Sequence, residues 1–421
     1  MKQKRPFYGW KLAVVVGMMY FCSGDAVLPT ATIVNPLMLQ DPDMHMTGTI
    51  LGAGFSLFIL MQGLPGPLIG TLIAKKGARF TMMAGSFIMI VGAIAMILFV
   101  RTPLMYFLFF GILLSVGSIM AGLLSVQSTV GNWFVVKRGM AMTLTMGIAG
   151  VGAIVVPFIA NKVVEASGGA WQSGWYLIAA FGVILIPVAF FLVKNKPEDI
   201  GQSPDGAQQP LAQIQGDSTS SFVYKNTACV PHRAAIKTLP FWLIALTGTG
   251  GFFAYSLATS QGVIHFTTLG FDQTLVVGAV VSMGIASLVG RIAIGSLSDR
   301  FEPLRLMTLS LFVAAFGILL AVIASNETMV YGYYLCTGFG FGAITTTLPT
   351  AVANYFGAGE FPKNLGTTML ITTLFASCIP LISGAVFDAT GFCTFAFMGS
   401  CLFVVLCALS GLFVKIPKQK L

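Results

Sequence analysis

The chain has 421 residues, of which 56% are hydrophobic and only 9% are charged. A soluble globular protein carries roughly 25% charged residues, because water must solvate its surface. The composition therefore excludes a soluble enzyme, a disordered chain and a secreted disulfide scaffold. The net charge of +9 does not indicate a nucleic-acid partner, because the basic residues form short clusters between apolar runs. That pattern is typical of membrane orientation and predicts an integral protein of the lipid bilayer.

Twelve apolar runs are long enough to cross a bilayer, since a helix spans the hydrocarbon core with about 20 residues. The predicted spans are 10–36, 47–73, 79–100, 104–131, 139–163, 173–193, 240–269, 274–297, 304–324, 328–355, 365–388 and 392–414. The stretch between the sixth and seventh runs is too polar to insert and is predicted to be a linker. We therefore predict an N-terminal six-helix bundle over 1–193, a cytoplasmic linker over 194–238 and a C-terminal six-helix bundle over 239–421.

The distribution of lysine and arginine predicts the orientation of the spans. If both termini lie on the same side, 20 of the 23 basic residues fall on that side and only Arg101 and Lys162 on the other. Cytoplasmic loops carry the excess of positive charge in multi-span proteins. Both termini are therefore predicted to be cytoplasmic, with the protein in the cell (inner) membrane. The remaining cation, Arg291, lies inside the eighth span.

The two halves of the chain repeat each other weakly. The segment Gly70-Thr71-Leu72-Ile73-Ala74-Lys75-Lys76 follows the second span, and Gly295-Ser296-Leu297-Ser298-Asp299-Arg300-Phe301 follows the eighth span 225 positions later. Similar halves with a binding site at their interface are typical of transporters that rock one bundle against the other. The sequence thus predicts an all-α integral membrane fold of twelve helices in two pseudo-symmetric six-helix bundles.

The chain resembles the major facilitator superfamily, and within it the branch of monocarboxylate transporters and oxalate–formate antiporters. The segments that carry this resemblance are Tyr8-Gly9-Trp10, Trp133-Phe134, Lys137-Arg138-Gly139-Met140-Ala141 and Ser287-Leu288-Val289-Gly290-Arg291. The resemblance implies alternating access, with a gating loop in each half. The residues implied at these loops are Gly70, Arg79, Gly295, Asp299 and Arg300.

This chain departs from the family pattern at four positions. Ala74 stands where the superfamily usually has Asp, and Glu302 stands where it usually has Gly. Thr30 follows the first-span proline where monocarboxylate carriers commonly have Lys, and Ser287 replaces their eighth-span Asp. The last two departures weaken a transfer of the family's proton-coupling scheme to this chain.

Arg291 is the strongest candidate for substrate binding. An arginine within the bilayer costs at least about 2.5–3.5 kcal/mol, so its side chain must face protein or water. Its guanidinium is always charged and fits a carboxylate through two parallel hydrogen bonds. We predict that Arg291 binds the carboxylate of an organic anion. The alternative is a structural arginine that backbone carbonyls or a buried aspartate satisfy.

Asp25 and His265 are the candidates for proton coupling. Asp25, in the first span, could bind a proton or pair with Arg291 when the site is empty; the alternative is a hydrated residue of the outer funnel. His265, in the outer third of the seventh span, could titrate near neutral pH, but a histidine hydrogen-bonded at the helix end is the favoured interpretation.

Other polar residues inside spans are predicted to line the substrate path, although hydroxyls often serve helix packing instead. They are Tyr20, Gln127, Ser128, Thr145, Tyr255, Tyr333, Thr346 and Thr372. No catalytic constellation, metal cluster or cofactor motif is visible in the sequence, so we expect no enzyme, no metal and no cofactor.

The predicted function is secondary transport of a small organic anion by a monomer. The eleventh span, 365–388, contains no Lys or Arg, and one fixed cation favours one carboxylate. We therefore predict proton symport of a lactate- or pyruvate-type monocarboxylate. The alternatives are anion exchange of the oxalate–formate type, then efflux of drugs or metabolites, then a membrane sensor of anions. The sensor is disfavoured because the linker leaves no room for a signalling domain.

Overall fold

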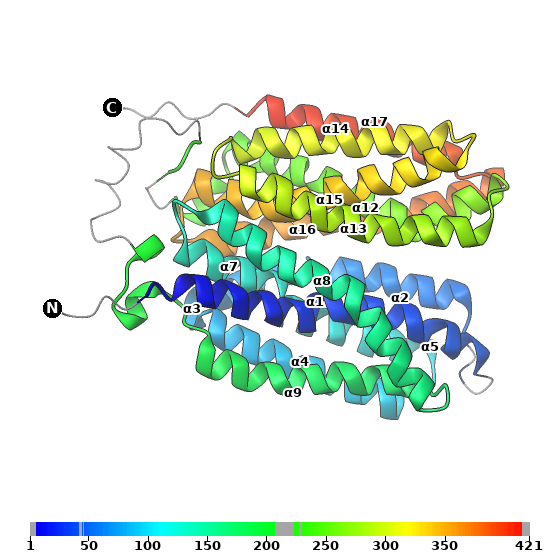
Figure 1. Cartoon of the computed structure of the whole chain (residues 1–421), viewed down its shortest axis with the longest axis horizontal. Helices are drawn as coiled ribbons and strands as arrows, with labels where there is room; N and C mark the ends of the chain where they lie inside the picture. The colour runs from blue at the N-terminus through cyan, green and yellow to red at the C-terminus, as the bar shows by residue number, and fades with distance from the viewer. Residues whose placement is uncertain (1–5, 42–43, 45, 207–222, 227–229, 415–421) are drawn as a thin grey trace.

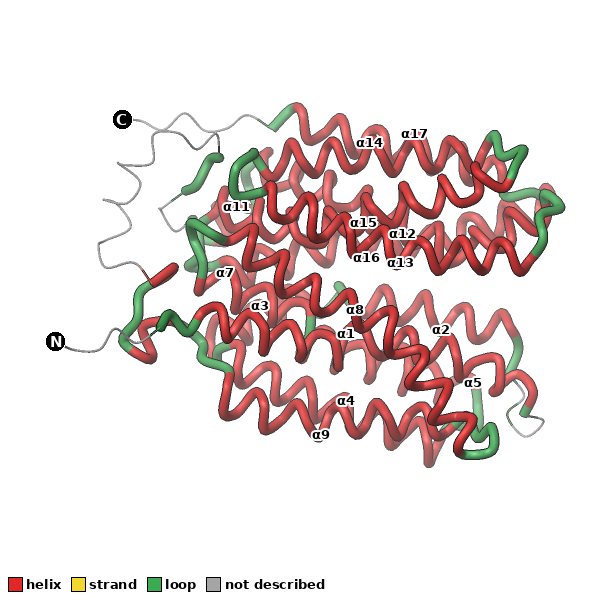
Figure 2. The backbone as a smooth tube through the Cα atoms, viewed as in Figure 1, coloured by secondary structure: helices red, strands yellow, loops and turns green. Residues whose placement is uncertain are grey.

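The structure is built from long apolar helices. This computed structural model describes residues 6–41, 44, 46–206, 223–226 and 230–414, and Figure 2 shows helices and loops, with no strand, in that part of the chain. Within these described residues, eleven helices are long and apolar enough to cross a membrane, and a bent pair brings the number of spans to as many as twelve. The predicted all-α membrane fold is thereby confirmed.

The helices form two bundles that lie side by side (Figure 1). The first bundle contains α1 (Gly9–Gln40), α2 (Gly48–Met61), α3 (Gly66–Lys76), α4 (Ala78–Phe99), α5 (Pro103–Tyr106), η1 (Phe107–Leu114), α6 (Ser115–Ala121), α7 (Leu123–Trp133), α8 (Arg138–Ala166) and α9 (Gln172–Leu192). The second contains α12 (Leu239–Thr268), α13 (Gln273–Leu297), α14 (Pro303–Val322), α15 (Glu327–Phe356), α16 (Phe361–Thr390) and α17 (Thr394–Leu412).

Two spans of the first bundle are interrupted, which the apolar runs did not predict. The second span bends by 43° between α2 and α3. At the bend, a Cβ on Gly63 would lie 1.7 Å from the hydroxyl oxygen of Thr373 on α16, so the break lets the two bundles approach. The fourth span passes from the π-helical stretch η1 through α6 to a break at Gly122, after which α7 begins.

We call one end of the bundles the linker end, because the described parts of the linker lie there together with the start of α1 and the end of α17 (Figure 1). The linker contains the short turns η2 (Pro197–Ile200), η3 (Pro204–Gly206) and α11 (His232–Ala235).

The two bundles are in close contact at the linker end. A Cβ on Gly70 of α3 would lie 2.3 Å from the carbonyl oxygen of Pro362, where α16 begins. Likewise, a Cβ on Gly139 of α8 would lie 2.0 Å from the hydroxyl of Ser298. At Gly284 of α13, which is further from the linker end, a Cβ would lie 4.0 Å from its nearest neighbour, the Ile154 side chain of α8. Figure 1 shows α8 leading away from α13 toward the opposite end. The linker end is therefore closed by direct backbone contact.

Candidate functional site

A buried ion pair joins the two bundles. Arg291 lies on α13, six residues before the helix ends at Leu297. Its Nη1 donates to the Asp25 carboxylate of α1 at 3.2 Å and to the Met146 carbonyl of α8 at 3.0 Å. The side chains of Arg291 and Asp25 are only 6% and 15% exposed. The sequence left the pairing of Arg291 with Asp25 as one of two alternatives for Asp25, and the structure places this ion pair between the N-terminal and C-terminal bundles.

A glycine on α8 makes room for the guanidinium. A Cβ on Gly150 would lie 2.7 Å from the Arg291 Nη1 atom, so any other residue there would displace the charge. The Nε atom of Arg291 is buried and has no hydrogen-bond partner in the described part of the chain. Because guanidinium is a pure donor, this leaves one buried donor available to a further acceptor.

Two phenol rings flank the ion pair. Tyr20, one turn before Asp25 on α1, is hydrogen-bonded to the Asp25 carboxylate. Tyr255 of α12 interacts electrostatically with both charged groups, and its ring stacks on Phe341 of α15 with centroids 3.9 Å apart. At 3.2 Å and an effective dielectric constant near 20, the two charges attract each other by about 5 kcal/mol. This attraction offsets part of the desolvation of both groups.

Gln127 of α7 lies close to the ion pair. Its amide nitrogen donates to the Thr345 carbonyl of α15 at 3.1 Å and contacts the Met146 sulfur at 3.8 Å. Its Oε1 is buried without a partner among the described residues. Since the Met146 carbonyl accepts from Arg291, Gln127 is separated from the ion pair by a single residue.

The predicted hydroxyl residues bond to backbone. The hydroxyls of Ser128, Thr346 and Thr372 donate to carbonyls of their own helices. The Thr145 hydroxyl donates to Ala141 and, at 3.2 Å, to Ala13 of α1. These bonds match the alternative reading of such residues as helix-packing groups.

Tyr333 and His265 lie inside the C-terminal bundle. The rings of Tyr333 and Phe397 have centroids 5.8 Å apart, and the Tyr333 side chain is fully buried. His265 is 2% exposed, stacks on Phe397 at 4.1 Å and has its Nε2 3.0 Å from the Ala321 carbonyl oxygen. It follows Tyr255 by ten residues on the same helix, which is about 15 Å of rise. The structure therefore places His265 away from the ion pair, in the hydrogen-bonded position that the sequence favoured.

The residues predicted at the gating loops divide between the two bundles. Asp299 accepts the backbone N–H groups of Gly139 and Met140 at 2.7 and 2.8 Å, so it caps α8 from the opposite bundle. Burial raises the pKa of Asp299, and these two hydrogen bonds act against the rise.

The remaining gating residues have structural contacts. A Cβ on Gly295 would lie 2.1 Å from the Thr143 hydroxyl of α8, and Gly70 contacts α16. The Arg79 guanidinium lies 4.5 Å from the Phe190 ring inside the first bundle, whereas Arg300 is exposed.

Two groups near the site were missed from sequence: the Met146 carbonyl and the Phe341 ring. A backbone carbonyl has no side-chain signal, and Phe341 lies in a glycine-rich stretch, which is typical of close helix packing. Away from the site, Asn354 accepts a hydrogen bond from Arg138 at 2.8 Å across the bundles.

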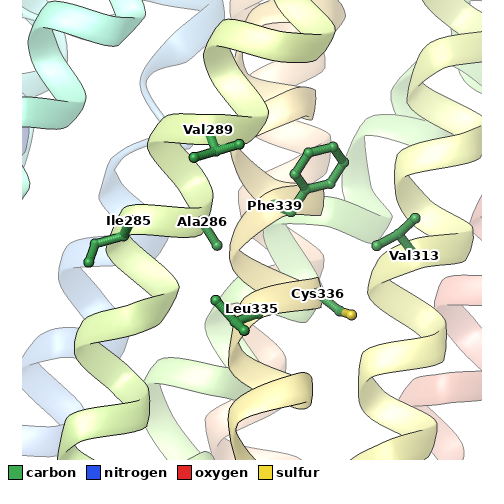
Figure 3. A pocket seen from close by; sticks show the side chains of 7 residues that line it. All are labelled: Ile285, Ala286, Val289, Val313, Leu335, Cys336 and Phe339. Atoms are coloured by element: carbon green, nitrogen blue, oxygen red, sulfur yellow. The ribbon is translucent and has the colours of Figure 1, made fainter.

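A separate apolar hollow lies between α13, α14 and α15, and Figure 3 shows the side chains that line it, among them Ala286, Cys336 and Phe339. No charged group lines it, so it does not fit an anion. In the described residues, no group of three or more His, Cys, Asp or Glu side chains could hold a metal ion.

Comparison with known sequences places the chain in a family. The model of the Major Facilitator Superfamily matches residues 13–361 and 263–421. An uncharacterized MFS-type transporter of Escherichia coli, YhjX, is 23% identical over 59% of this chain and 58% of its own length. Monocarboxylate transporter 13 of Bos taurus is 25% identical over 86% of this chain and 79% of its own length. The MFS transporter asaE of Aspergillus flavus is 24% identical over 82% and 73%.

Solved structures show the same fold at low identity. The fucose:proton symporter FucP of E. coli has a TM-score of 0.65 at 15% identity, over 97% of this chain and 99% of FucP. The human organic anion transporter MFSD10 has a TM-score of 0.70 at 12% identity, over 97% and 100%. These relatives are transporters and not enzymes, as predicted. The chain is a multi-span membrane transporter that belongs to the Major Facilitator Superfamily.

Proposed function

We propose that this protein carries small organic anions, namely monocarboxylates of the lactate or pyruvate type, across the cell (inner) membrane together with protons. The observation that supports this most is the buried Arg291–Asp25 pair between the bundles. A permanent cation at this interface, held by one internal carboxylate, suits an external carboxylate that takes the place of Asp25.

The exchange of carboxylates at Arg291 supplies a means of proton coupling. When the substrate carboxylate binds the guanidinium, Asp25 loses its counter-charge in a site that is largely dry. An isolated carboxylate in such surroundings takes up a proton, because a buried unpaired charge is costly. Tyr20 remains hydrogen-bonded to Asp25 and holds it at the site. One anion and one proton then cross together, and the site keeps its net charge.

The single fixed cation is the reason for proposing one carboxylate. Residues 365–388 of the eleventh span contain no Lys or Arg, so a dicarboxylate would find no second cation there. The similarity to a monocarboxylate transporter of Bos taurus agrees with this substrate class. The exchange of two anions is the second candidate, because Arg291 could pass from one carboxylate to the next without using Asp25 as a proton carrier.

The orientation of the protein in the membrane is proposed from the distribution of its basic residues. With 20 of 23 basic residues on the side of the termini, we propose that the linker end is cytoplasmic and that residues 194–238 form a cytoplasmic linker between the bundles. A closed cytoplasmic end corresponds to an outward-facing state.

Uptake of labelled L-lactate into proteoliposomes tests the proposal. We expect lactate to accumulate when the outside is more acidic than the lumen, and the accumulation to stop when a protonophore collapses the gradient. Vesicles without protein provide the control. Uptake that ignores the proton gradient but requires vesicles preloaded with pyruvate or oxalate would replace symport by exchange. If neither condition gives uptake of lactate or pyruvate, the proposed substrate class is wrong.

A further inference from the structure

Two carboxylates from different segments cap the start of α8. The Asp205 carboxylate, in the linker turn η3, accepts the N–H groups of Val135 and Val136 at 2.8 Å and that of Lys137 at 3.1 Å. Asp299, from the C-terminal bundle, accepts the N–H groups of Gly139 and Met140. The positive end of a helix attracts such charges. The linker and the C-terminal bundle thus hold the same helix end of the N-terminal bundle.

A linker lysine lies near these carboxylates. The Lys225 ammonium donates to the Val136 carbonyl at 2.7 Å. It interacts electrostatically with both Asp299 and Asp205; burial and the nearby Arg138 lower its pKa, and the two carboxylates act against this shift. Two like charges on one helix end repel each other, so a cation from the linker near them stabilises the arrangement.

The linker segment that carries Lys225 is anchored to the other bundle. The Tyr224 N–H donates to the Glu302 carboxylate at 2.9 Å, and the Asn226 N–H donates to the Asn354 carbonyl at 2.7 Å. Further on, the Val230 N–H donates to the Phe356 carbonyl at 3.1 Å. These bonds satisfy carbonyls that the end of α15 leaves free. Glu302, 4% exposed, stands where the superfamily usually has glycine, and here it receives the linker.

We propose that Asp205 and Lys225 form a clasp through which the linker holds the linker end of the transporter closed. Opening this end requires α8 to separate from α13. Because the segment around Lys225 is fixed to α15 and Glu302, that separation pulls its ammonium away from Val136. The linker is then a working part of the gate that sets the ratio of open to closed molecules. The clasp concerns the gate alone and requires no particular substrate.

Distance measurements between spin labels test the clasp without any substrate. The labels are placed at Lys76→Cys on α3 and Arg305→Cys on α14, both exposed near the linker end, in a background without the seven native cysteines. The test variants are Asp205→Asn and Lys225→Met. The matched controls are Asp199→Asn, whose carboxylate accepts the Lys196 N–H within the linker, and Lys196→Met.

We expect each test variant to increase the ratio of open to closed molecules about five- to tenfold, as the loss of one charge-assisted interaction would, and to add a population with a longer label distance. The controls should match the parent protein. Only variants that elute as a single species in size-exclusion chromatography are compared. Lys225→Met leaves the α8 N–H groups capped. If Asp205→Asn does not fold, Lys225→Met alone tests the clasp. Unchanged distance distributions in the folded test variants would overturn the clasp, whatever the outcome of the lactate experiment.

Discussion

Replacing Asp25 by Asn should make the transporter bind its anion more tightly. In the empty protein the Asp25 carboxylate occupies Arg291 at 3.2 Å, so every incoming carboxylate competes with it. Asn has nearly the same shape and can still accept a hydrogen bond from the guanidinium, but it carries no charge. The substitution therefore removes the electrostatic competitor while leaving the packing around Arg291 in place.

The size of the effect follows from the geometry. The attraction at 3.2 Å is about 5 kcal/mol at an effective dielectric constant near 20. The hydrogen bond that Asn keeps, from a charged donor to a neutral acceptor, retains about 1.5 kcal/mol of this. Part of the remainder is cancelled by the desolvation of Asp25 in the native site. We assign about 2–3 kcal/mol to the lost competition, which corresponds to about 30- to 150-fold tighter binding.

Calorimetric titration of the purified protein with L-lactate measures this directly. The control is Glu165→Gln, which removes an exposed carboxylate that is hydrogen-bonded to Asn161. We expect tighter binding for Asp25→Asn, native affinity for Glu165→Gln, and uptake by Asp25→Asn that no longer responds to a proton gradient. Equal or weaker lactate binding by a folded Asp25→Asn protein would refute the competition at Arg291.

Three further outcomes are expected. His265→Phe should keep gradient-driven lactate uptake, because His265 stacks on Phe397 within one bundle; loss of the gradient response in the uptake assay would assign proton coupling to His265. Gly70→Val should shift the spin-label distance toward the open form at least tenfold, since its side chain would overlap the Pro362 carbonyl; an unchanged distance would contradict the close contact. Burial raises the pKa of Asp299 at the closed end, so the closed state binds the proton more tightly than a hydrated open state. Lowering the pH from 7.5 to about 5 should therefore favour closure in the label experiment, and Asp299→Asn should weaken this dependence.

The number and nature of the spans could be predicted from sequence because the bilayer demands about 20 apolar residues for each helix. The interruptions could not. The bend before α3 depends on the approach of α16 at Gly63, and residues 63 and 373 are brought together only by the fold. Apolar character is the same on both sides of such a break, so hydropathy contains no sign of it.

Only the charged residues of the candidate site could be identified from the sequence. Arg291 stands out because a cation within an apolar span needs a reason. The sequence left its pairing with Asp25 as one of two alternatives. The membrane depths of two residues that are 266 positions apart cannot be compared from sequence alone. The proximity of Gly150 to the guanidinium emerges only from the arrangement of α8 and α13.

Arg291 is proposed to bind the transported anion. The most direct measurement is the rate of labelled L-lactate uptake by proteoliposomes that contain native protein, Arg291→Gln or Arg101→Gln, all under the same inward proton gradient. Arg101 is exposed and serves as the matched control. We predict native rates for Arg101→Gln and, for a folded Arg291→Gln protein, uptake no faster than in vesicles without protein. Native uptake by Arg291→Gln would contradict the account and make Arg291 a structural residue.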